Sequence, residues 1–238
     1  MVLQAQENKA MILAAGLGTR LKPLTDHKPK ALLEWEGKPL LEHIILKLKS
    51  SGFTSIIINV HHHAEMIMDF IKHKDQFGIG IEFSHEKDEL LDTGGGIANA
   101  SWFFEKEAFL VYNVDIFSDI DLRAMYEDHF KSGALVTLAV KERVTTRSLL
   151  MSEEGFLKGW RDNRTGETIL TGASADGLIP IAFSAIHIMD PKVFTLFPKE
   201  KRFPLMPFYL DLARTYPVNL YRHDRDSWAD MGKLESFT

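Results

Sequence analysis

The 238-residue sequence contains no cysteine. This absence excludes disulfide bridges, thiolate zinc sites and cysteine nucleophiles, so any chemistry must come from oxygen and nitrogen groups. It also suits a reducing compartment, and we expect a cytoplasmic protein. No apolar run approaches the roughly 20 residues that a membrane helix requires. The first nine residues are polar and lack the core of a signal peptide, so we expect no membrane partner.

The chain also lacks an excess of positive charge, since its formal net charge is −5. No global basic field attracts nucleic acid, and we expect no nucleic-acid partner; any anion site must be built locally. Apolar residues make up 45% of the chain and charged residues 26%, which is typical of globular proteins. This length predicts one large α/β domain with a substantial core.

Two familiar phosphate-binding motifs are missing as well. In Gly16-x-Gly18-x-x-Leu21, a leucine stands where the dinucleotide fingerprint needs its third glycine. The Gly-Lys pairs at 37–38 and 232–233 are not followed by the serine or threonine of a P-loop. The sequence therefore disfavours a dinucleotide-dependent oxidoreductase, and any phosphate loop must be of another kind.

What the sequence does contain is a glycine-bearing loop with cations after a predicted buried strand. The apolar run 10–15 predicts the strand, and Gly16 and Gly18 follow it. Glycines let backbone N–H groups approach phosphate oxygens, and Arg20 and Lys30 can neutralise the remaining charge. The alternative is a tight turn with exposed basic residues. The clustering of these groups within twenty residues favours phosphate binding.

Residues 13–25, Leu-Ala-Ala-Gly-Leu-Gly-Thr-Arg-Leu-Lys-Pro-Leu-Thr, and then Pro-Lys-Ala-Leu at 29–32, resemble the signature of the sugar-nucleotide pyrophosphorylases. These nucleotidyltransferases join a sugar 1-phosphate to a nucleoside triphosphate. The resemblance extends from Met11 to Glu235. It implies a three-layer, Rossmann-like α/β fold with a mixed, mostly parallel central sheet. It also implies a single domain, 1–238, with a nucleotide-binding half at about 9–115 and a sugar-phosphate half at about 116–238.

The resemblance assigns roles to the loop. Arg20 and Lys30 are the implied catalytic cations. The nucleotide is implied to contact Ala14, Ala15, Gly16, Gly18 and Thr19.

A second glycine-rich stretch, Asp92 to Ile97, precedes a helix that we expect to open at Ala98. Successive glycines lose extra backbone entropy on folding, so a purely structural loop seldom needs three of them. Close approach of a flat ligand would explain the missing side chains, although a plain helix entry is the alternative. In the resembled family this segment lies against the nucleobase, which implies that Thr93 and Gly94 contact the base.

The apolar run 109–112 predicts a strand that leads directly to Asp115. A carboxylate at the carboxyl end of a central strand lies where open α/β sheets bind ligands. The alternative, an aspartate that caps the next helix, is our interpretation of Asp119 and Asp121. The resemblance implies that Asp115 holds Mg²⁺.

The segment Trp228-Ala229-Asp230 matches the family pattern Trp-x-Asp, and the resemblance implies that Asp230 is the second metal ligand. Two carboxylates without a thiolate suit a hard cation such as Mg²⁺, which is the predicted cofactor. The resemblance further implies that Asn113 faces the sugar. Val114 and Lys233 depart from the family pattern.

The family's sugar-phosphate lysine, in a Glu-Lys-Pro setting, is absent from this chain. The candidate replacements are Lys158, Arg161 and Arg164. We take Arg161 as the predicted sugar-phosphate contact and leave the other two open.

The expected substrates are a nucleoside triphosphate and a sugar 1-phosphate, and the sequence does not define an oligomeric state. The glycine-rich stretch and Asn113 are most similar to compact N-acetylmuramate 1-phosphate uridylyltransferases and to short mannose-1-phosphate guanylyltransferase-like proteins. We favour N-acetylmuramate 1-phosphate with UTP over mannose 1-phosphate with GTP; phosphocholine with CTP is a third alternative. A non-catalytic sugar-nucleotide sensor is the alternative from another class.

Hydrophobic periodicity predicts most of the remaining elements. The expected helices span 39–51, 65–73, 122–132 and 206–215, and the expected strands span 55–60, 79–84, 135–141, 148–152, 156–160, 168–170, 180–188 and 218–221.

Overall fold

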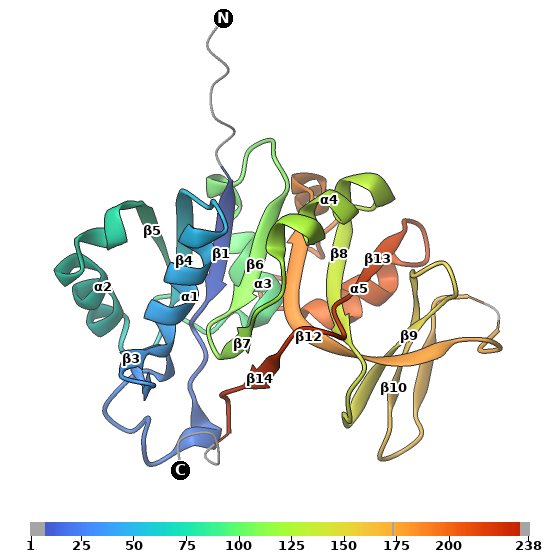
Figure 1. The fold of residues 1–238 in the computed structure, drawn as a ribbon, viewed down its shortest axis with the longest axis horizontal. Helices are drawn as coiled ribbons and strands as arrows, with labels where there is room; N and C mark the ends of the chain where they lie inside the picture. Colours follow the sequence, from blue (N-terminus) through green and yellow to red (C-terminus); the bar gives the residue numbers. More distant parts are fainter. Residues whose placement is uncertain (1–7, 173, 234–238) are drawn as a thin grey trace, which may run out of the picture.

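The computed structural model describes residues 8–172 and 174–233, so Leu234 and Glu235, at the end of the family resemblance, lie outside it. A ten-stranded sheet runs through the molecule (Figure 1). Its strands are β1 (Lys9–Leu13), β4 (Ser55–Val60), β5 (Gly80–His85), β6 (Phe109–Asn113), β8 (Val136–Lys141), β9 (Arg147–Met151), β10 (Leu157–Asp162), β11 (Thr168–Leu170), β12 (Ile179–Met189) and β13 (Val218–Arg222). Two small ribbons pair β2 (Glu34–Trp35) with β3 (Lys38–Pro39) and β7 (Ile116–Ser118) with β14 (Trp228–Asp230).

The N-terminal half of the sheet is parallel, in the order β5-β4-β1-β6. β12 then pairs antiparallel with β6, β8 and β9, and β13 pairs parallel with β8. The strands β9, β10 and β11 form antiparallel pairs at the far end. The parallel strands are buried and read as apolar runs because helices cover both faces. This is the mixed, mostly parallel central sheet that the loop motif predicted.

Within the described residues, five α-helices pack on the sheet: α1 (Leu40–Ser50), α2 (Ala64–His73), α3 (Asp92–Asn99), α4 (Leu122–Ser132) and α5 (Leu205–Leu212). Short 3₁₀ helices span Thr19–Leu21, Lys30–Leu32, Asp75–Gly78, Ser101–Phe103 and Pro191–Thr195.

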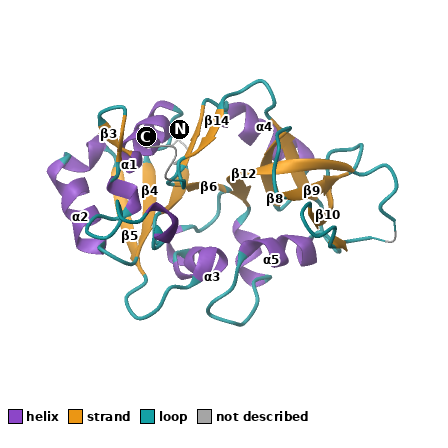
Figure 2. Cartoon of the chain, turned by 90° about the horizontal axis from the view of Figure 1, so that it is seen from below, coloured by secondary structure: helices purple, strands orange, loops and turns teal. Residues whose placement is uncertain are grey.

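Alternating strand residues divide the core into two clusters. Ile12 and Ile58 pack with α1, α2 and α4 on one face, whereas Met11 and Ile57 pack with α3 and α5 on the other. Figure 2 shows these two sets of helices on opposite sides of the strands. The fold therefore has the three layers that the family resemblance implied.

The boundaries of three predicted helices differ from the prediction, and α2 begins one residue early, at Ala64. The first helix begins at Leu40 because Pro39 belongs to β3 and has extended backbone angles. The last helix ends at Leu212, three residues before the predicted end. Asp121 caps α4 as predicted, since its side chain accepts from the N–H groups of Arg123 and Ala124. Asp119 instead accepts from the N–H of Ser227, at 2.6 Å, and so holds the C-terminal segment.

The glycines at 94–96 lie inside α3, so the expectation that they precede the helix is wrong. A Cβ on Gly94 would lie 2.2 Å from Cε2 of Phe203, and one on Gly95 would lie 2.3 Å from the carbonyl oxygen of Lys201. The N–H groups of both glycines also donate to the Phe203 carbonyl, at 2.9 and 3.2 Å. The segment leading into α5 therefore makes the close approach that we expected from a ligand.

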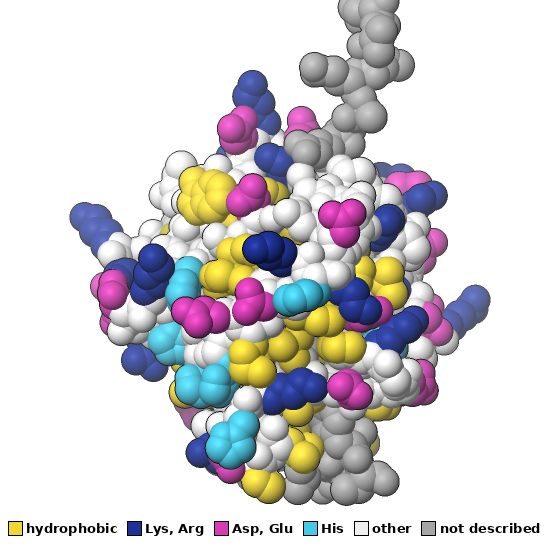
Figure 3. All heavy atoms as spheres, turned by 90° about the vertical axis from the view of Figure 1, so that its left-hand side faces the viewer, with side chains coloured by type: hydrophobic (Ala, Val, Ile, Leu, Met, Phe, Trp, Pro, Cys, Tyr) yellow, Lys and Arg dark blue, Asp and Glu magenta, His cyan; other side chains and the backbone are white. Residues whose placement is uncertain are grey.

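Surface charge is mixed on the face where α2 lies. Lysine or arginine and aspartate or glutamate side chains alternate over it without a patch of one sign (Figure 3). Among the described residues, no helix is both long enough and apolar enough to cross a membrane.

A buried histidine links the sheet to α5. His187 on β12 and Tyr209 on α5 are both buried, and the Tyr209 hydroxyl is hydrogen-bonded to Nδ1 of His187. Nε2 of His187 is buried without a partner in the described structure. Burial lowers the pKa of His187 from its ordinary value of 6.5 to about 3, because the charged imidazolium loses its hydration.

This shift predicts a pH-dependent stability. Between pH 6.5 and about 3 the unfolded state binds the His187 proton and the folded state does not. The free energy of unfolding should therefore fall with decreasing pH in this range, by up to about 1.4 kcal/mol per pH unit from this group. The variant His187→Phe should reduce that slope in urea titrations at a series of pH values, whereas substitution of exposed His27 by Gln should not. Equal slopes for His187→Phe and wild type would contradict the prediction.

Candidate active site

A short glycine-bearing loop, residues 14–18, connects the end of β1 to the 3₁₀ turn at Thr19. Ala14 and Ala15 are buried beneath it, and Gly16, Thr19 and Arg20 are exposed at its surface. The loop lies at the carboxyl end of the parallel strands, which is the usual ligand-binding edge of an open α/β sheet.

The two loop glycines have different physical roles. Gly18 has a φ of +64°, and a Cβ there would lie 2.8 Å from Cγ2 of Thr25. The Thr25 hydroxyl donates to the Gly18 carbonyl at 2.9 Å, and this hydrogen bond anchors the loop. By contrast, a Cβ on Gly16 would meet nothing within 4 Å. The fold therefore requires glycine at 18 but not at 16.

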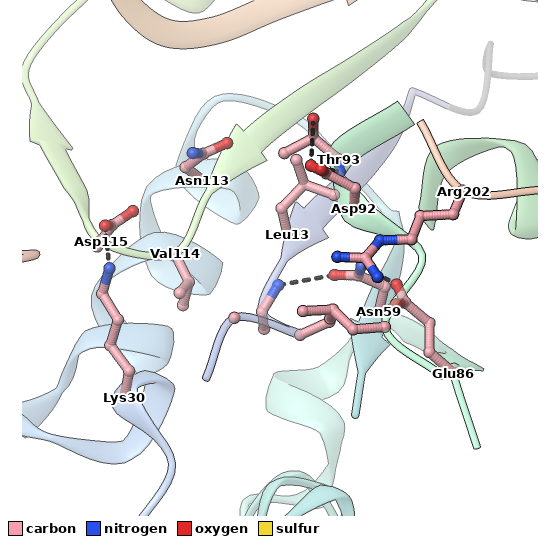
Figure 4. Close-up of a pocket in the computed structure, with 14 residues that line it drawn as sticks. Leu13, Lys30, Asn59, Glu86, Asp92, Thr93, Asn113, Val114, Asp115 and Arg202 are labelled. Atoms are coloured by element: carbon pink, nitrogen blue, oxygen red, sulfur yellow. Dashed lines mark hydrogen bonds and ion pairs between the residues drawn. The ribbon is translucent and has the colours of Figure 1, made fainter. Parts of the chain in front are cut away.

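A cavity of about 300 Å³ opens beside this loop (Figure 4). The predicted site residues that line it are Ala14, Ala15, Gly16, Lys30, Thr93, Asn113 and Asp115. Leu13, Asp92 and Val114, which belong to the sequence motifs but were given no role, also line it, together with four residues that sequence reasoning did not identify: Asn59, Glu86, Leu90 and Arg202.

Asn59 and Glu86 form a buried polar link across the back of this cavity. The N–H of Ala14 donates to Asn59 Oδ1 at 2.7 Å, and Asn59 Nδ2 donates to Glu86 Oε1 at 2.7 Å. The second Glu86 oxygen accepts from the N–H of Leu91 at 2.8 Å. This chain of bonds joins the loop after β1 to the turn before α3. The only sequence signal for it is one polar residue, Asn59, inside an otherwise apolar strand.

Lys30 and Asp115 form an ion pair at the other side of the cavity. Nζ of Lys30 donates to Oδ2 of Asp115, and each side chain is only 13% exposed. Lys30 is held at the start of a 3₁₀ turn, and Asp115 lies between β6 and β7. A pair so poorly hydrated is electrostatically strong, and removal of one partner leaves a largely buried charge.

The C-terminal segment brings Asp230 to the same place. β14 pairs with β7, with Asp230 opposite Ile116, and the N–H of Met231 donates to the Asp115 carbonyl at 2.8 Å. The chain then passes through Gly232, which is buried.

Gly232 leaves a small cradle between charged groups. The point where its Cβ would lie is 2.7 Å from Asp230 Oδ1, 2.9 Å from Asp115 Oδ2 and 3.0 Å from Arg20 Nη2. Since Lys30 is bonded to Asp115, the structure gathers all four predicted charged residues at one point. The described residues contain no cluster of three or more metal-ligating side chains, so an ion at the two carboxylates would need further ligands from water or substrate.

Two other predicted residues lie away from this point. Gly94 is buried against Phe203 in α3. Arg161 is on β10, where its Nε donates to Thr168 at 3.3 Å. Their predicted contacts with base and sugar phosphate stay predictions.

The remaining candidate cations differ in their surroundings. Arg164 forms a two-bond ion pair with Asp162, whose pKa is lowered mainly by these hydrogen bonds. Lys158 is exposed on β10.

The glycine-bearing loop thus lies at the sheet edge, and two carboxylates and two cations meet beside it, as the resemblance to the nucleotidyltransferases implied. Residues 9–148 match the family model described as nucleotidyl transferase, and the chain belongs to this family. Within it, the relatives identify the chain as a sugar-1-phosphate nucleotidyltransferase, which confirms the family that the loop motif predicted.

The N-acetylmuramate alpha-1-phosphate uridylyltransferase of Caulobacter vibrioides is 31% identical over 243 residues, covering 93% of both chains. The protein of the same name from Neisseria meningitidis is 44% identical over 119 residues, or 50% of this chain and 52% of that one. Mannose-1-phosphate guanylyltransferase catalytic subunit beta of Drosophila pseudoobscura is 34% identical over 238 residues. That match covers 96% of this chain and 60% of the relative.

Solved structures share the fold. HddC from Yersinia pseudotuberculosis, complexed with GMP-PN, superposes with a TM-score of 0.78 at 23% identity, covering 97% of this chain and 96% of that chain. A UDP-glucose pyrophosphorylase complexed with UDP-glucose gives a TM-score of 0.75 at 18% identity, covering 98% and 96%.

The two loop glycines predict opposite phenotypes. Gly16→Ala should leave the melting temperature unchanged but weaken nucleotide binding by about tenfold or more, because the methyl group would enter the space beside the loop amides. Gly18→Ala should lower stability by about 1–3 kcal/mol, because it combines positive φ with a steric conflict. Thermal unfolding and calorimetric titration with UTP and GTP measure both effects. A Gly16→Ala variant that binds nucleotide as tightly as wild type would place the nucleotide elsewhere.

Proposed function

We propose that this chain joins N-acetylmuramate 1-phosphate to UTP, with release of pyrophosphate. The observation that carries the proposal is the convergence of Arg20, Lys30, Asp115 and Asp230 around Gly232, beside the cavity that Lys30 and Asp115 line. The choice of sugar and base is supported by the Caulobacter uridylyltransferase, which this chain matches over 93% of both lengths. It spans only about 60% of the fly guanylyltransferase subunit.

The proposed reaction is an in-line displacement at phosphorus. A phosphate oxygen of the sugar 1-phosphate attacks the α-phosphorus of the nucleotide, the bond to the β-phosphate oxygen breaks, and pyrophosphate leaves with that electron pair. The attacking oxygen is already anionic, so the protein needs no general base. Its task is to position two anions and to neutralise the developing charge.

The residues divide this task between the two halves of the domain. In residues 9–115, the loop amides from Gly16 to Thr19 bind the triphosphate, and Arg20 and Lys30 supply positive charge. Thr93 lines the cavity and would contact the base together with Gly94. Residues 116–238, together with Asn113, would hold the sugar phosphate.

The two carboxylates beside Gly232 are donors of the kind that suits a small divalent cation. Asp115 Oδ2 and Asp230 Oδ1 both lie close to Gly232, and Lys30 is bonded to the same Asp115 oxygen, so a cation bound there would take the place of Lys30 at Asp115. Oxygen ligands are those that Mg²⁺ prefers. A bound Mg²⁺ would neutralise phosphate charge, and Asp115 and Asp230 would hold it.

The second candidate is the transfer of GMP from GTP to mannose 1-phosphate. The 34% identity to the fly subunit over 96% of this chain favours it, and the same cavity and charged residues would serve. The two candidates share a mechanism and differ in the base and the sugar.

A substrate panel tests the reaction. Purified protein should release pyrophosphate with UTP and N-acetylmuramate 1-phosphate at least about tenfold faster, as kcat/KM, than with GTP and mannose 1-phosphate or with CTP and phosphocholine. EDTA should abolish the release and added Mg²⁺ should restore it. Preference for GTP with mannose 1-phosphate would select the second candidate. No pyrophosphate with any pair would contradict the enzyme and favour a sensing role.

Removal of the ion pair tests the site. Lys30→Ala and Asp115→Asn should each lower kcat by about 10²–10³-fold, because each removes charge stabilisation at the transferring phosphoryl group. Lys28→Ala is the matched control, since Lys28 is two residues away and makes only an exposed pair with Glu34 at 3.4 Å. Circular dichroism should show that all three variants fold. Near-normal turnover in Lys30→Ala or Asp115→Asn would refute the assignment.

A further inference from the structure

Arg143 is a cation that the sequence reading did not single out. It follows β8 and is half-buried. Its guanidinium carbon lies 3.8 Å from the ring centroid of Trp228, and its Nη2 donates to the Phe183 carbonyl at 2.8 Å. Stacking on an aromatic ring and a carbonyl bond fix the plane of the guanidinium, so its remaining donors point in defined directions.

The guanidinium lies on the same face of β14 as the predicted metal ligand. Side chains alternate along a strand, so Trp228 and Asp230 share a face and Ala229 points the other way. Burial lowers the pKa of Arg143, and the Asp230 carboxylate opposes this shift, which means that the two charges interact. Arg143 is therefore a neighbour of the charged cradle at Gly232.

Arg143 also has unused capacity to bind. An arginine carries five N–H donors, and its Nε is buried without a partner among the described residues. Its Nη groups carry four of these donors, and the one that Nη2 gives to the Phe183 carbonyl leaves others for a ligand. A phosphate group accepts from two guanidinium nitrogens at once.

A second cavity, of about 650 Å³, lies among β9, β10, β12 and α5, with apolar walls that include Trp160, Phe183 and Met206. Arg143 does not line this cavity, but its Nη2 donates to the carbonyl of Phe183, whose residue does. The backbone of Phe183 therefore links Arg143 to a cavity large enough for a sugar.

The cations at 158–164 are less well placed for this role. Trp160 lines the second cavity, so the adjacent Arg161 points to the opposite face of β10. Arg164 is neutralised by Asp162.

From this arrangement we infer that Arg143 binds the phosphate of the sugar 1-phosphate, with the sugar in the second cavity. The inference rests on the proposed function. It also explains how a chain without the family's Glu-Lys-Pro segment can hold a second phosphate. The phosphate would lie at the Nη groups of Arg143, on the side that faces the cradle at Gly232.

The test compares Arg143→Gln and Arg143→Lys with Arg161→Gln and a matched control, Arg222→Gln. Arg222 is exposed and pairs with Asp224 at 2.7 Å, so its loss removes the same charge away from the site. The measurements are KM for N-acetylmuramate 1-phosphate and for mannose 1-phosphate, KM for UTP and GTP, and KM for pyrophosphate in the reverse reaction. Calorimetry measures the binding of each nucleotide alone and of each sugar 1-phosphate, with no turnover required.

Arg143→Gln should raise KM and Kd for the sugar 1-phosphate by about 10- to 100-fold, the loss expected for charge-assisted hydrogen bonds. Nucleotide affinity and KM for pyrophosphate should stay within about twofold, which a general loss of structure would not allow. Arg143→Lys should give intermediate values of KM and Kd for the sugar 1-phosphate. Lysine keeps the positive charge but lacks the planar guanidinium that donates to two phosphate oxygens at once. Arg222→Gln should behave as wild type.

Three results would overturn the inference: unchanged sugar 1-phosphate affinity in Arg143→Gln, an equal loss of nucleotide affinity, or no binding of either sugar 1-phosphate by wild type. A loss of sugar 1-phosphate affinity in Arg161→Gln alone would assign the role to Arg161 instead. Binding that depends on Arg143 without any turnover would support the inference and contradict only the proposed reaction.

Discussion

The charged cradle at Gly232 depends on one tertiary contact, the pairing of β14 with β7. This short ribbon places Asp230 opposite Ile116 and bonds the chain after it to the Asp115 carbonyl. It therefore joins the last described segment of the chain to the end of the central strand β6. Without it, Asp230 would not share a site with Asp115 and Lys30, and the cradle at Gly232 would keep only the Asp115 carboxylate. The Asp119 side chain accepts a hydrogen bond from the N–H of Ser227 and so holds the same segment in place.

The rest of the site is built by supports that do not touch the charged groups. The bonds from Ala14 through Asn59 to Glu86 hold the two walls of the first cavity at a set separation. The glycines of α3 let the segment before α5 pack directly on the helix, and this contact also carries Arg202 to the edge of the cavity. Both supports are buried, so they define the shape of the first cavity through packing.

The parts of the fold that could be predicted from sequence are those with a local signal. The parallel strands are apolar runs, and the helices have apolar residues at helical spacing, so their positions agree within one to three residues with the structure. The short ribbons β2–β3 and β7–β14 have no such signal, because two or three residues are too few for a period. The glycines at 94–96 were misread for a related reason: their packing partner, Phe203, is more than a hundred residues away in the chain.

By itself, the sequence determined the class of protein and the chemistry available to it. The family pattern includes the loop of residues 13–25 with Arg20, the basic Lys30, and the acidic Asp115 and Asp230, and all of these can be recognised without a structure. Only the tertiary structure decided which groups meet. It buried Lys30 against Asp115, made Gly232 the space between two carboxylates, and set Arg143 on Trp228 beside Asp230. The reason is that local patterns reflect neighbours in the chain, whereas an active site is made of neighbours in space.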